Sequence, residues 1–434
     1  MHHSAVPITR RRLLTAAGAA TAAAAAAGAW RPPAAVGWWD DAGRDWPSAA
    51  HDLAATRAAP IAVRQGRIRW VARLAGGVPG AAAIAGRTVV AASLGGEVAA
   101  FDLLTGRERW RVAPPLEPFF AGPAIAGDRV IVASDRAAAL DLRTGRTLWT
   151  APLLRSGIGD DYFWGPPVVA GGLVLIGSGS GAEEPRTRGR LTAYDLRTGA
   201  LRWSTPTVPE GANGGGVLGP PTVAGDRVYV TTGAPYAGDP APGTSSLIEL
   251  ALRDGAVTWV APSGQPNDLN SAALLLGRGA FATGKDGVHA WDRARRAKLW
   301  HTAITPPAAA QPGPTDGPEF GPLATDGRRL YALSNDAAAG TVTAAALDPR
   351  TGATAWRTPL PGFAFAPPAI AGDQLWTATA AGALHAVDLR DGRLRRTIAL
   401  ENPSAATVTS ARGFVLAGTG AGPHLPGDTL AAIA

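Results

Sequence analysis

The chain has 434 residues, of which 46% are hydrophobic, and it contains 55 glycines, 37 prolines and no cysteine. This much apolar content excludes an intrinsically disordered chain, the glycines and prolines disfavour an all-helical fold, and the lack of cysteine excludes disulfides, thiolate zinc sites and cysteine nucleophiles. The formal net charge of +7 falls to +4 when Arg10, Arg11 and Arg12 are left out as part of a predicted export signal, so charge gives little support for a nucleic-acid partner.

The N-terminal segment has the pattern of a twin-arginine (Tat) signal peptide. Arg10, Arg11 and Arg12 precede Leu13, and an alanine-rich stretch runs to Ala29, with small residues suited to cleavage at its end. The alternative is an uncleaved membrane anchor, but these 17 mostly alanine residues are short and weakly apolar for a bilayer span. We therefore expect export by the Tat pathway, to the extracellular space, the periplasm or the cell envelope, with no transmembrane domain in the mature chain.

Most of the remaining chain repeats one short pattern, in which an aspartate stands eight residues, and a glycine four residues, before a tryptophan. The clearest copies are Asp102/Gly106/Trp110, Asp141/Gly145/Trp149, Asp195/Gly199/Trp203 and Asp348/Gly352/Trp356. Other copies drift, with Ala251 in place of the aspartate, Arg296 in place of the glycine and Arg396 in place of the tryptophan. Self-similarity of this kind indicates an array of equivalent structural units.

Each unit is predicted to be an antiparallel sheet of four short strands. In residues 122–153, hydrophobic runs are separated by AGDR, SDR and LRTGR, and the glycines in these turns can take positive φ and close hairpins. The repeated tryptophan falls near the start of the fourth strand, where its ring can cover the face of a neighbouring sheet. Seven of the 14 tryptophans, Trp70 included, occupy this position, so we expect these seven to be structural.

The two ends of the chain complete one further unit. Residues 428–434 are predicted to form a third strand, and residues 66–74 a fourth strand that lacks the first three. A blade built from both termini closes the ring and removes free sheet edges. We therefore predict an all-β fold, an eight-bladed β-propeller at 63–434, preceded by the signal peptide at 1–29 and an N-terminal linker or extension at 30–62.

The long insertions are predicted to gather on one face of the ring, at residues 154–165, 180–189, 207–218, 234–245 and 304–320. In an up-and-down blade, the loops between the second and third strands share a face with the connections between blades, and the tight turns lie on the other face. Variable loops on a rigid scaffold commonly carry binding, so we expect the functional site on this long-loop face.

Eight blades of this motif resemble the PQQ-like propeller superfamily, and several stretches are similar to quinoprotein alcohol dehydrogenases, especially the polyvinyl-alcohol-dehydrogenase-like branch. The opening DWPSAAHDLAATR (45–57) resembles the start of that branch, and GKDGVHAWD (284–292) and LAGTGAGPHLPGDTLAAIA (416–434) follow in the family's order. The resemblance implies pyrroloquinoline quinone (PQQ) on the ring axis, stacked on a tryptophan, and a Ca²⁺ ion held by glutamate, asparagine and aspartate. BamB-type propellers, which bind partners, are more distantly similar.

The resemblance also implies roles for five residues. Glu183 matches the Ca²⁺-binding glutamate, and Lys285 matches the basic residue that contacts the quinone and supports the chemistry. Asp268, as base and metal ligand, and Asn270, as metal ligand, are imperfect matches to the acidic segment, while Trp164 is a candidate substitute for the stacking tryptophan. These residue types suit the chemistry because Ca²⁺ prefers oxygen ligands, a cation stabilises negative charge on the quinone oxygen, and a carboxylate accepts the alcohol proton.

The sequence departs from the family pattern at two anchors. The family's asparagine ligand falls on Ala234 and its stacking tryptophan falls near Leu218, so a metal ligand and an aromatic floor are missing there. Plainer structural interpretations also stay open: Lys285 as a turn residue beside Asp286, and Glu183 as part of a solvated charge run.

Three functions are compatible with the sequence. The first is a quinoprotein-type oxidoreductase acting on a small alcohol or polyol with PQQ and Ca²⁺; the second is a non-catalytic propeller that binds an envelope protein or polysaccharide through the long-loop face; the third is an enzyme that reuses the axial pocket without PQQ. The acidic and aromatic stretch 160–164 suits either a substrate pocket or a loop over the ring mouth. No nucleic-acid partner is expected, because the arginines are dispersed around the ring, and a monomer is favoured.

Overall fold

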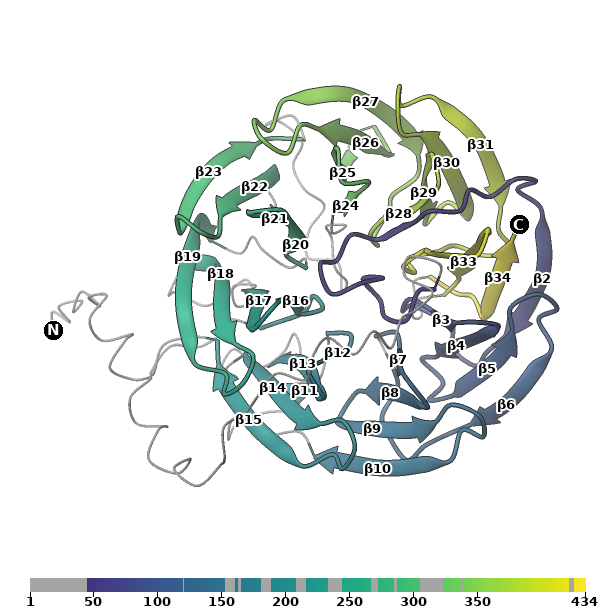
Figure 1. Cartoon of the computed structure of the whole chain (residues 1–434). Coiled ribbons are helices and arrows are strands. Elements are labelled where there is room, and N and C mark those ends of the chain that lie inside the picture. The colour runs from purple at the N-terminus through teal and green to yellow at the C-terminus, as the bar shows by residue number, and fades with distance from the viewer. Residues whose placement is uncertain are drawn as a thin grey trace, which may run out of the picture.

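The computed structural model describes residues 45–119, 121–152, 161–162, 165–180, 189–207, 216–232, 244–266, 272–284, 287–304, 323–336, 339–420 and 425–434. Its strands form a ring of eight sheets, each with four antiparallel strands (Figure 1). The prediction of an all-β, eight-bladed propeller is confirmed. Among the described residues there is no helix with the length and apolar character that a bilayer span requires.

Within each blade the strands follow one another from the ring centre outward. Blade 1 comprises β3 (Ala83–Ala85), β4 (Thr88–Ala92), β5 (Val98–Asp102) and β6 (Glu108–Val112). Blade 2 comprises β7 (Ala124–Ala126), β8 (Arg129–Ala133), β9 (Arg136–Asp141) and β10 (Thr147–Pro152). Blade 3 comprises β12 (Val168–Ala170), β13 (Leu173–Ser180), β14 (Arg190–Asp195) and β15 (Leu201–Pro206), and the short β11 (Asp161–Tyr162) pairs with β13. Blade 4 comprises β16 (Thr222–Ala224), β17 (Arg227–Thr232), β18 (Thr244–Ala251) and β19 (Val257–Pro266).

The second half of the ring repeats this order. Blade 5 comprises β20 (Leu274–Leu276), β21 (Gly279–Gly284), β22 (Gly287–Asp292) and β23 (Ala297–Thr302). Blade 6 comprises β24 (Ala324–Thr325), β25 (Leu330–Asp336), β26 (Thr341–Leu347) and β27 (Thr354–Pro361). Blade 7 comprises β28 (Ala369–Ala371), β29 (Gln374–Thr379), β30 (Ala383–Asp388) and β31 (Leu394–Ala399), and β1 (Ala58–Ala59) joins its inner edge in parallel. Blade 8 comprises β32 (Thr409–Ala411), β33 (Phe414–Gly418), β34 (Thr429–Ile433) and β2 (Ile68–Arg73).

Blade 8 closes the ring as the sequence predicts. Its first three strands come from the C-terminal end, and its outermost strand, β2, comes from the N-terminal side and runs antiparallel to β34. Trp70 of β2 lies opposite Ala432 in this pairing. A single buried apolar cluster extends from blade 7 through blade 8 to blade 1, so the junction between the two ends of the chain is packed as core.

The repeated tryptophan docks on the following blade. The indole N–H of Trp70 donates a hydrogen bond to the Leu103 carbonyl at 2.8 Å, and a Cβ on Gly106 would lie 2.6 Å from the indole ring. The same docking pairs Trp110 with Gly145, Trp149 with Gly199, Trp203 with Gly255, Trp300 with Gly352 and Trp356 with Gly392. The glycine of each repeat is therefore the docking surface for the tryptophan of the preceding blade. Because each blade presents one tryptophan and receives another, both residues recur at a fixed spacing.

The repeated aspartate holds the turn on which the tryptophan docks. Asp102 Oδ1 accepts hydrogen bonds from the backbone N–H groups of Leu104 and Thr105, and Arg109 Nη2 pairs with Oδ2 at 2.9 Å. Burial alone would raise the pKa of Asp102, but the hydrogen bonds from Arg87, Arg109 and the Thr105 hydroxyl lower it well below its ordinary value. The carboxylate is thus charged and fully bonded within the turn.

Two repeats that depart from the pattern pack differently where one blade meets the next. Arg296 occupies the glycine position of blade 5 with φ of 55°, in the left-handed region that side chains rarely adopt. In blade 7 the tryptophan is replaced by Arg396, whose guanidinium lies where a Cβ on Gly66 would be, 1.9 Å from Nη1. The boundary after blade 7 is therefore packed by an arginine side chain against a glycine turn.

Candidate functional site at the ring centre

The predicted site residues Glu183, Asp268, Asn270, Lys285 and Trp164 all lie outside the described residues, as does Ala234. The structure does describe the strands that lead into three of them: β13 ends at Ser180, β19 at Pro266 and β21 at Gly284. The second strands of all blades run in the same direction, so β13 and β21 end on the same face of the ring. This is the long-loop face, opposite the tight turns.

Leu218, which stands where the family's stacking tryptophan falls, lies within the described residues. It is partly buried, and its Cδ2 would lie 3.9 Å from a Cβ on Gly179, near the end of β13. Ser178 lies one residue earlier in this strand; it is 1% exposed and its hydroxyl has no hydrogen-bond partner. Buried hydroxyls are normally bonded, so Ser178 is an exception to that rule.

The other mouth of the ring is crossed by residues 45–59, the axial strap, drawn in purple across the centre of the ring in Figure 1. Its carbonyl groups accept hydrogen bonds from backbone N–H groups of the inner strands, with N to O distances of 2.7–2.9 Å. The bonds run from Ile84 to Trp46, Ile125 to Pro47, Val223 to Leu53, Leu275 to Ala54, Thr325 to Thr56, Ile370 to Arg57 and Gly372 to Ala59 (acceptor second); Trp46 N also donates back to Ile84. Through these backbone hydrogen bonds the strap reaches six of the eight blades, and it satisfies N–H donors on strand edges that face the axis.

The strap has an unusual backbone. His51, Ala55 and Arg57 have φ of 73°, 58° and 55°, and they account for three of the five non-glycine residues with positive φ in the described part of the chain. Such conformations cost of order 1 kcal/mol each and persist where the surroundings fix them. Here the hydrogen bonds to the inner strands provide that restraint.

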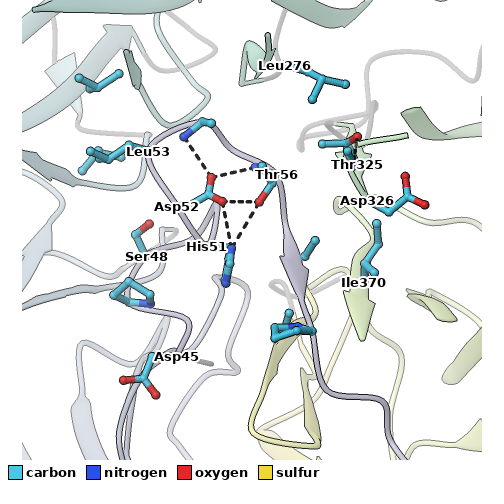
Figure 2. Close-up of a pocket in the computed structure, with 18 of the residues that line it drawn as sticks. Asp45, Ser48, His51, Asp52, Leu53, Thr56, Leu276, Thr325, Asp326 and Ile370 are labelled. Carbon is cyan, nitrogen blue, oxygen red and sulfur yellow. Dashed lines mark hydrogen bonds and ion pairs between the residues drawn. The ribbon is translucent and has the colours of Figure 1, made fainter. Parts of the chain in front are cut away.

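Asp52 organises the strap from within (Figure 2). Its Oδ1 accepts hydrogen bonds from the backbone N–H groups of Ala54 and Thr56, both at 3.0 Å, and its Oδ2 meets the Thr56 hydroxyl and, at 3.3 Å, His51 Nδ1. Burial would raise the pKa of Asp52, but the hydrogen bond and charge of His51, together with the bonds from Thr56, lower it below its ordinary value. The carboxylate is therefore saturated by its own segment.

A cavity of about 880 Å³ lies on the tight-turn side of the strap (Figure 2). Its apolar lining includes Leu53, Ile125, Val169, Val223, Leu276 and Ile370, and its polar lining includes Ser48, His51, Thr56 and Thr325. Three carboxylates, Asp45, Asp52 and Asp326, also line it, and none of the described lining residues is a lysine or an arginine. Asp45 is paired with Arg412 Nε at 2.7 Å, and Asp326 accepts hydrogen bonds from the backbone of the following turn, so both carboxylates have structural partners.

The histidines of the described chain have structural surroundings. His385 Nδ1 is 3.0 Å from the Thr397 hydroxyl and its Nε2 is 3.2 Å from the Pro361 carbonyl, and burial lowers its pKa. His51 packs against Trp46 with ring centroids 4.8 Å apart. Within the described ranges no group of three acidic or histidine residues could hold a metal ion.

The sequence predicts a linker or extension at residues 30–62, and the axial strap lies within that range. The strap carries no copy of the blade repeat, so periodicity gives it no place in the fold. A signal was nevertheless present: Trp46, fully buried in the structure, is a large apolar residue that a solvated linker would not need.

Comparisons with known proteins place these features in context. A family profile named PQQ_2 and described as "Outer membrane protein assembly factor BamB" matches residues 54–210, 133–283 and 284–433. A polyvinylalcohol dehydrogenase of Sphingopyxis sp. is 26% identical over 364 residues, which cover 67% of this chain and 54% of that protein, so the chain spans about half the length of this relative.

Two solved structures share the fold. A quinohemoprotein alcohol dehydrogenase, ADHIIG from Pseudomonas putida, has a TM-score of 0.75 at 17% identity, with 90% of this chain and 80% of that chain covered. BamB from Moraxella catarrhalis has a TM-score of 0.60 at 17% identity, with 85% of this chain and 97% of that chain covered. Sequence and structure therefore agree on a propeller whose relatives include both enzymes and an assembly factor.

Proposed function

This chain belongs to the PQQ_2 family of β-propeller proteins, and from that premise we propose that it is an exported oxidoreductase of quinoprotein type. Its substrate class would be small alcohols or polyols, and its cofactors PQQ and Ca²⁺ on the ring axis. The similarity to a polyvinylalcohol dehydrogenase over 364 residues supports this class of substrate.

The observation that carries the proposal is the asymmetry of the ring. The axial strap crosses the tight-turn mouth, while β13 and β21, which lead into Glu183 and Lys285, end on the opposite face. An axial ligand would therefore enter and be contacted from the long-loop face, where the family's motif residues belong. Leu218 offers an aliphatic surface where relatives stack a tryptophan.

The residues of this chain would bind the metal, cover the cofactor and act on the substrate, each in the role that its chemistry allows. Glu183, Asn270 and Asp268 would bind Ca²⁺ through oxygen atoms, and Trp164 would cover one face of the cofactor. Asp268 would accept the hydroxyl proton of the alcohol, and Lys285 would stabilise negative charge on the quinone oxygen. When bound, PQQ would supply the two-electron acceptor.

The test combines binding and turnover. We expect the melting temperature of the purified mature chain to rise with PQQ and Ca²⁺, and an artificial dye to be reduced when alcohols are added. Lys285→Ala and Glu183→Gln should abolish dye reduction. Lys298→Ala is the matched control, because this second lysine bonds the Ser263 carbonyl on an outer strand, at 2.8 Å, and should keep full activity. No thermal shift and no dye reduction in the wild type would refute the proposal.

A second candidate function is binding of an envelope protein or polysaccharide through the long-loop face. Leu218 favours it, because a partly exposed leucine near the axial mouth suits a macromolecular contact better than a stacked quinone. The wild-type chain separates the two functions: the second predicts binding to envelope material without dye reduction, whereas the first predicts dye reduction with PQQ and Ca²⁺.

A further inference from the structure

Arg57 of the axial strap is a buried cation with few partners. It is 2% exposed, and the structure gives it one hydrogen bond, from Nη1 to the Ala49 carbonyl at 2.7 Å. Its Nε is buried and has no partner. No carboxylate among the described residues forms an ion pair with it. A buried guanidinium in this state is costly, because burial removes its hydration and a single carbonyl replaces little of it.

The nearest acid does not neutralise it. Asp52 uses both carboxylate oxygens within the strap, on Ala54, Thr56 and His51, and acts on Arg57 only through space. Burial lowers the pKa of Arg57 to about 9, and the charge of Asp52 opposes this fall only in part. The guanidinium is thus still cationic at neutral pH and lacks a bonded counter-ion.

Thr56 and Ala58, on either side of Arg57, line the cavity on the tight-turn side, but Arg57 does not. Its bonding partner Ala49 is also absent from that lining. The Arg57 guanidinium is therefore separate from the lining of that cavity, which contains the carboxylates of Asp45, Asp52 and Asp326.

We propose that Arg57 anchors an anion site beside the axial strap, and that the site takes one small monovalent anion the size of a carboxylate group. The edge of a guanidinium formed by Nε and one Nη matches the two oxygens of a carboxylate. Because Nη1 is already bonded to Ala49, the Nε edge is the one left for a ligand. The bond from Nη1 to the Ala49 carbonyl holds the guanidinium within the strap.

Two sources could supply the anion: a free ion or a carboxylate of a larger axial ligand such as the quinone of the proposed function. Bromide is a suitable probe, since its anomalous scattering locates it. Crystals of the full mature chain grown in sodium bromide should show a bromide within about 3.5 Å of the Arg57 guanidinium. Addition of PQQ then separates the sources, because displacement of bromide assigns the site to a cofactor carboxylate, and retention assigns it to a free anion.

Solution measurements make the site testable in variants. At constant ionic strength, formate should raise the melting temperature of the wild type and of Arg412→Met, the matched control, whose arginine pairs with Asp45 of the strap. Arg57→Met should lose this response. Should that variant fail to fold, Arg57→Lys keeps the charge but loses the paired donors, and its apparent affinity for formate should fall at least tenfold while bromide still binds.

The site is disproved if no bromide lies at Arg57, if a carboxylate of the protein bonds its guanidinium in the crystal, or if formate stabilises wild type and Arg57→Met equally. These outcomes do not depend on catalysis. A failed test of PQQ binding with bromide present at Arg57 would refute the proposed function and leave the anion site standing.

Discussion

Arg296 Nη2 of blade 5 lies 3.2 Å from Glu249 Oε1 of blade 4, and this ion pair links two blades where the docking glycine has been lost. Glu249 is 4% exposed and also accepts hydrogen bonds from the Tyr229 hydroxyl at 2.9 Å and the Thr258 hydroxyl at 2.6 Å. A polar network thus takes over the role that a tryptophan on a glycine turn has at other boundaries.

Removal of this carboxylate should destabilise the ring. Glu249→Ala leaves Tyr229, Thr258 and Arg296 without their acceptor, so we expect a loss of about 2–4 kcal/mol in the free energy of unfolding, measured by urea denaturation. Glu108→Ala, which removes an exposed partner of Arg111, is the control and should cost less than about 1 kcal/mol. Equal losses in the two variants would contradict the assigned role.

The glycine beneath a docked tryptophan should be far less replaceable than a glycine in an open turn. Gly106 and Gly86 have φ of 69° and 57°, so alanine is strained at both, but a Cβ meets Trp70 only at Gly106 and nothing within 4 Å at Gly86. We expect Gly106→Ala to cost about 1–3 kcal/mol more than Gly86→Ala, because the indole must move away from the turn. Thermal unfolding of both variants checks this, and similar melting temperatures would disprove it.

Acid should weaken the ring through the turn aspartates. The folded-state pKa of Asp102 is depressed, so its bonds stabilise the protein above the ordinary aspartate pKa of about 4, and this stability is lost as the pH falls below that value toward the folded pKa. Asp102→Asn should therefore be less stable than the wild type at pH 6, and the difference should shrink between pH 5 and pH 3. A difference that stays constant over this range would show that the charge is not responsible.

Asp52 should control the order of the strap. Asp52→Ala removes the acceptor that holds Ala54 and Thr56, so we expect faster hydrogen exchange at the Val223, Leu275 and Thr325 amides that bond the strap. Exchange in the outer strands should not change. Ser48→Ala, in the same cavity lining, is the control; if it accelerates exchange as much as Asp52→Ala, the carboxylate has no special part.

The fold was predictable because its main determinant is repeated. Aspartate, glycine and tryptophan recur at one spacing, and each has a local reason in the turn and in docking, so even the shared blade could be found from Trp70 and the C-terminal strand. The partner of each tryptophan could not, because sequence spacing shows the repeat but not that Gly106 serves Trp70 of the previous blade.

The site was predictable to a smaller extent. Glu183 and Lys285 follow from resemblance to a family, and they lie outside the described residues. The axial strap and Arg57 have no repeat and no periodic pattern. Their place depends on hydrogen bonds to edges of six blades that lie far apart in the sequence, which only the folded ring brings together.

The strap also sets an order for biosynthesis. The seven carbonyl acceptors of the strap lie before Pro60, whereas the N–H groups that bond them lie as far along the chain as Gly372. Strand β2 likewise pairs with β34, which comes after all other strands in the sequence. The strap can therefore reach its final place only after the inner strand of blade 7 has been made, and β2 only after β34 has been made. Contacts of such long range fold slowly, so closure of the ring and seating of the strap should form one late, cooperative step.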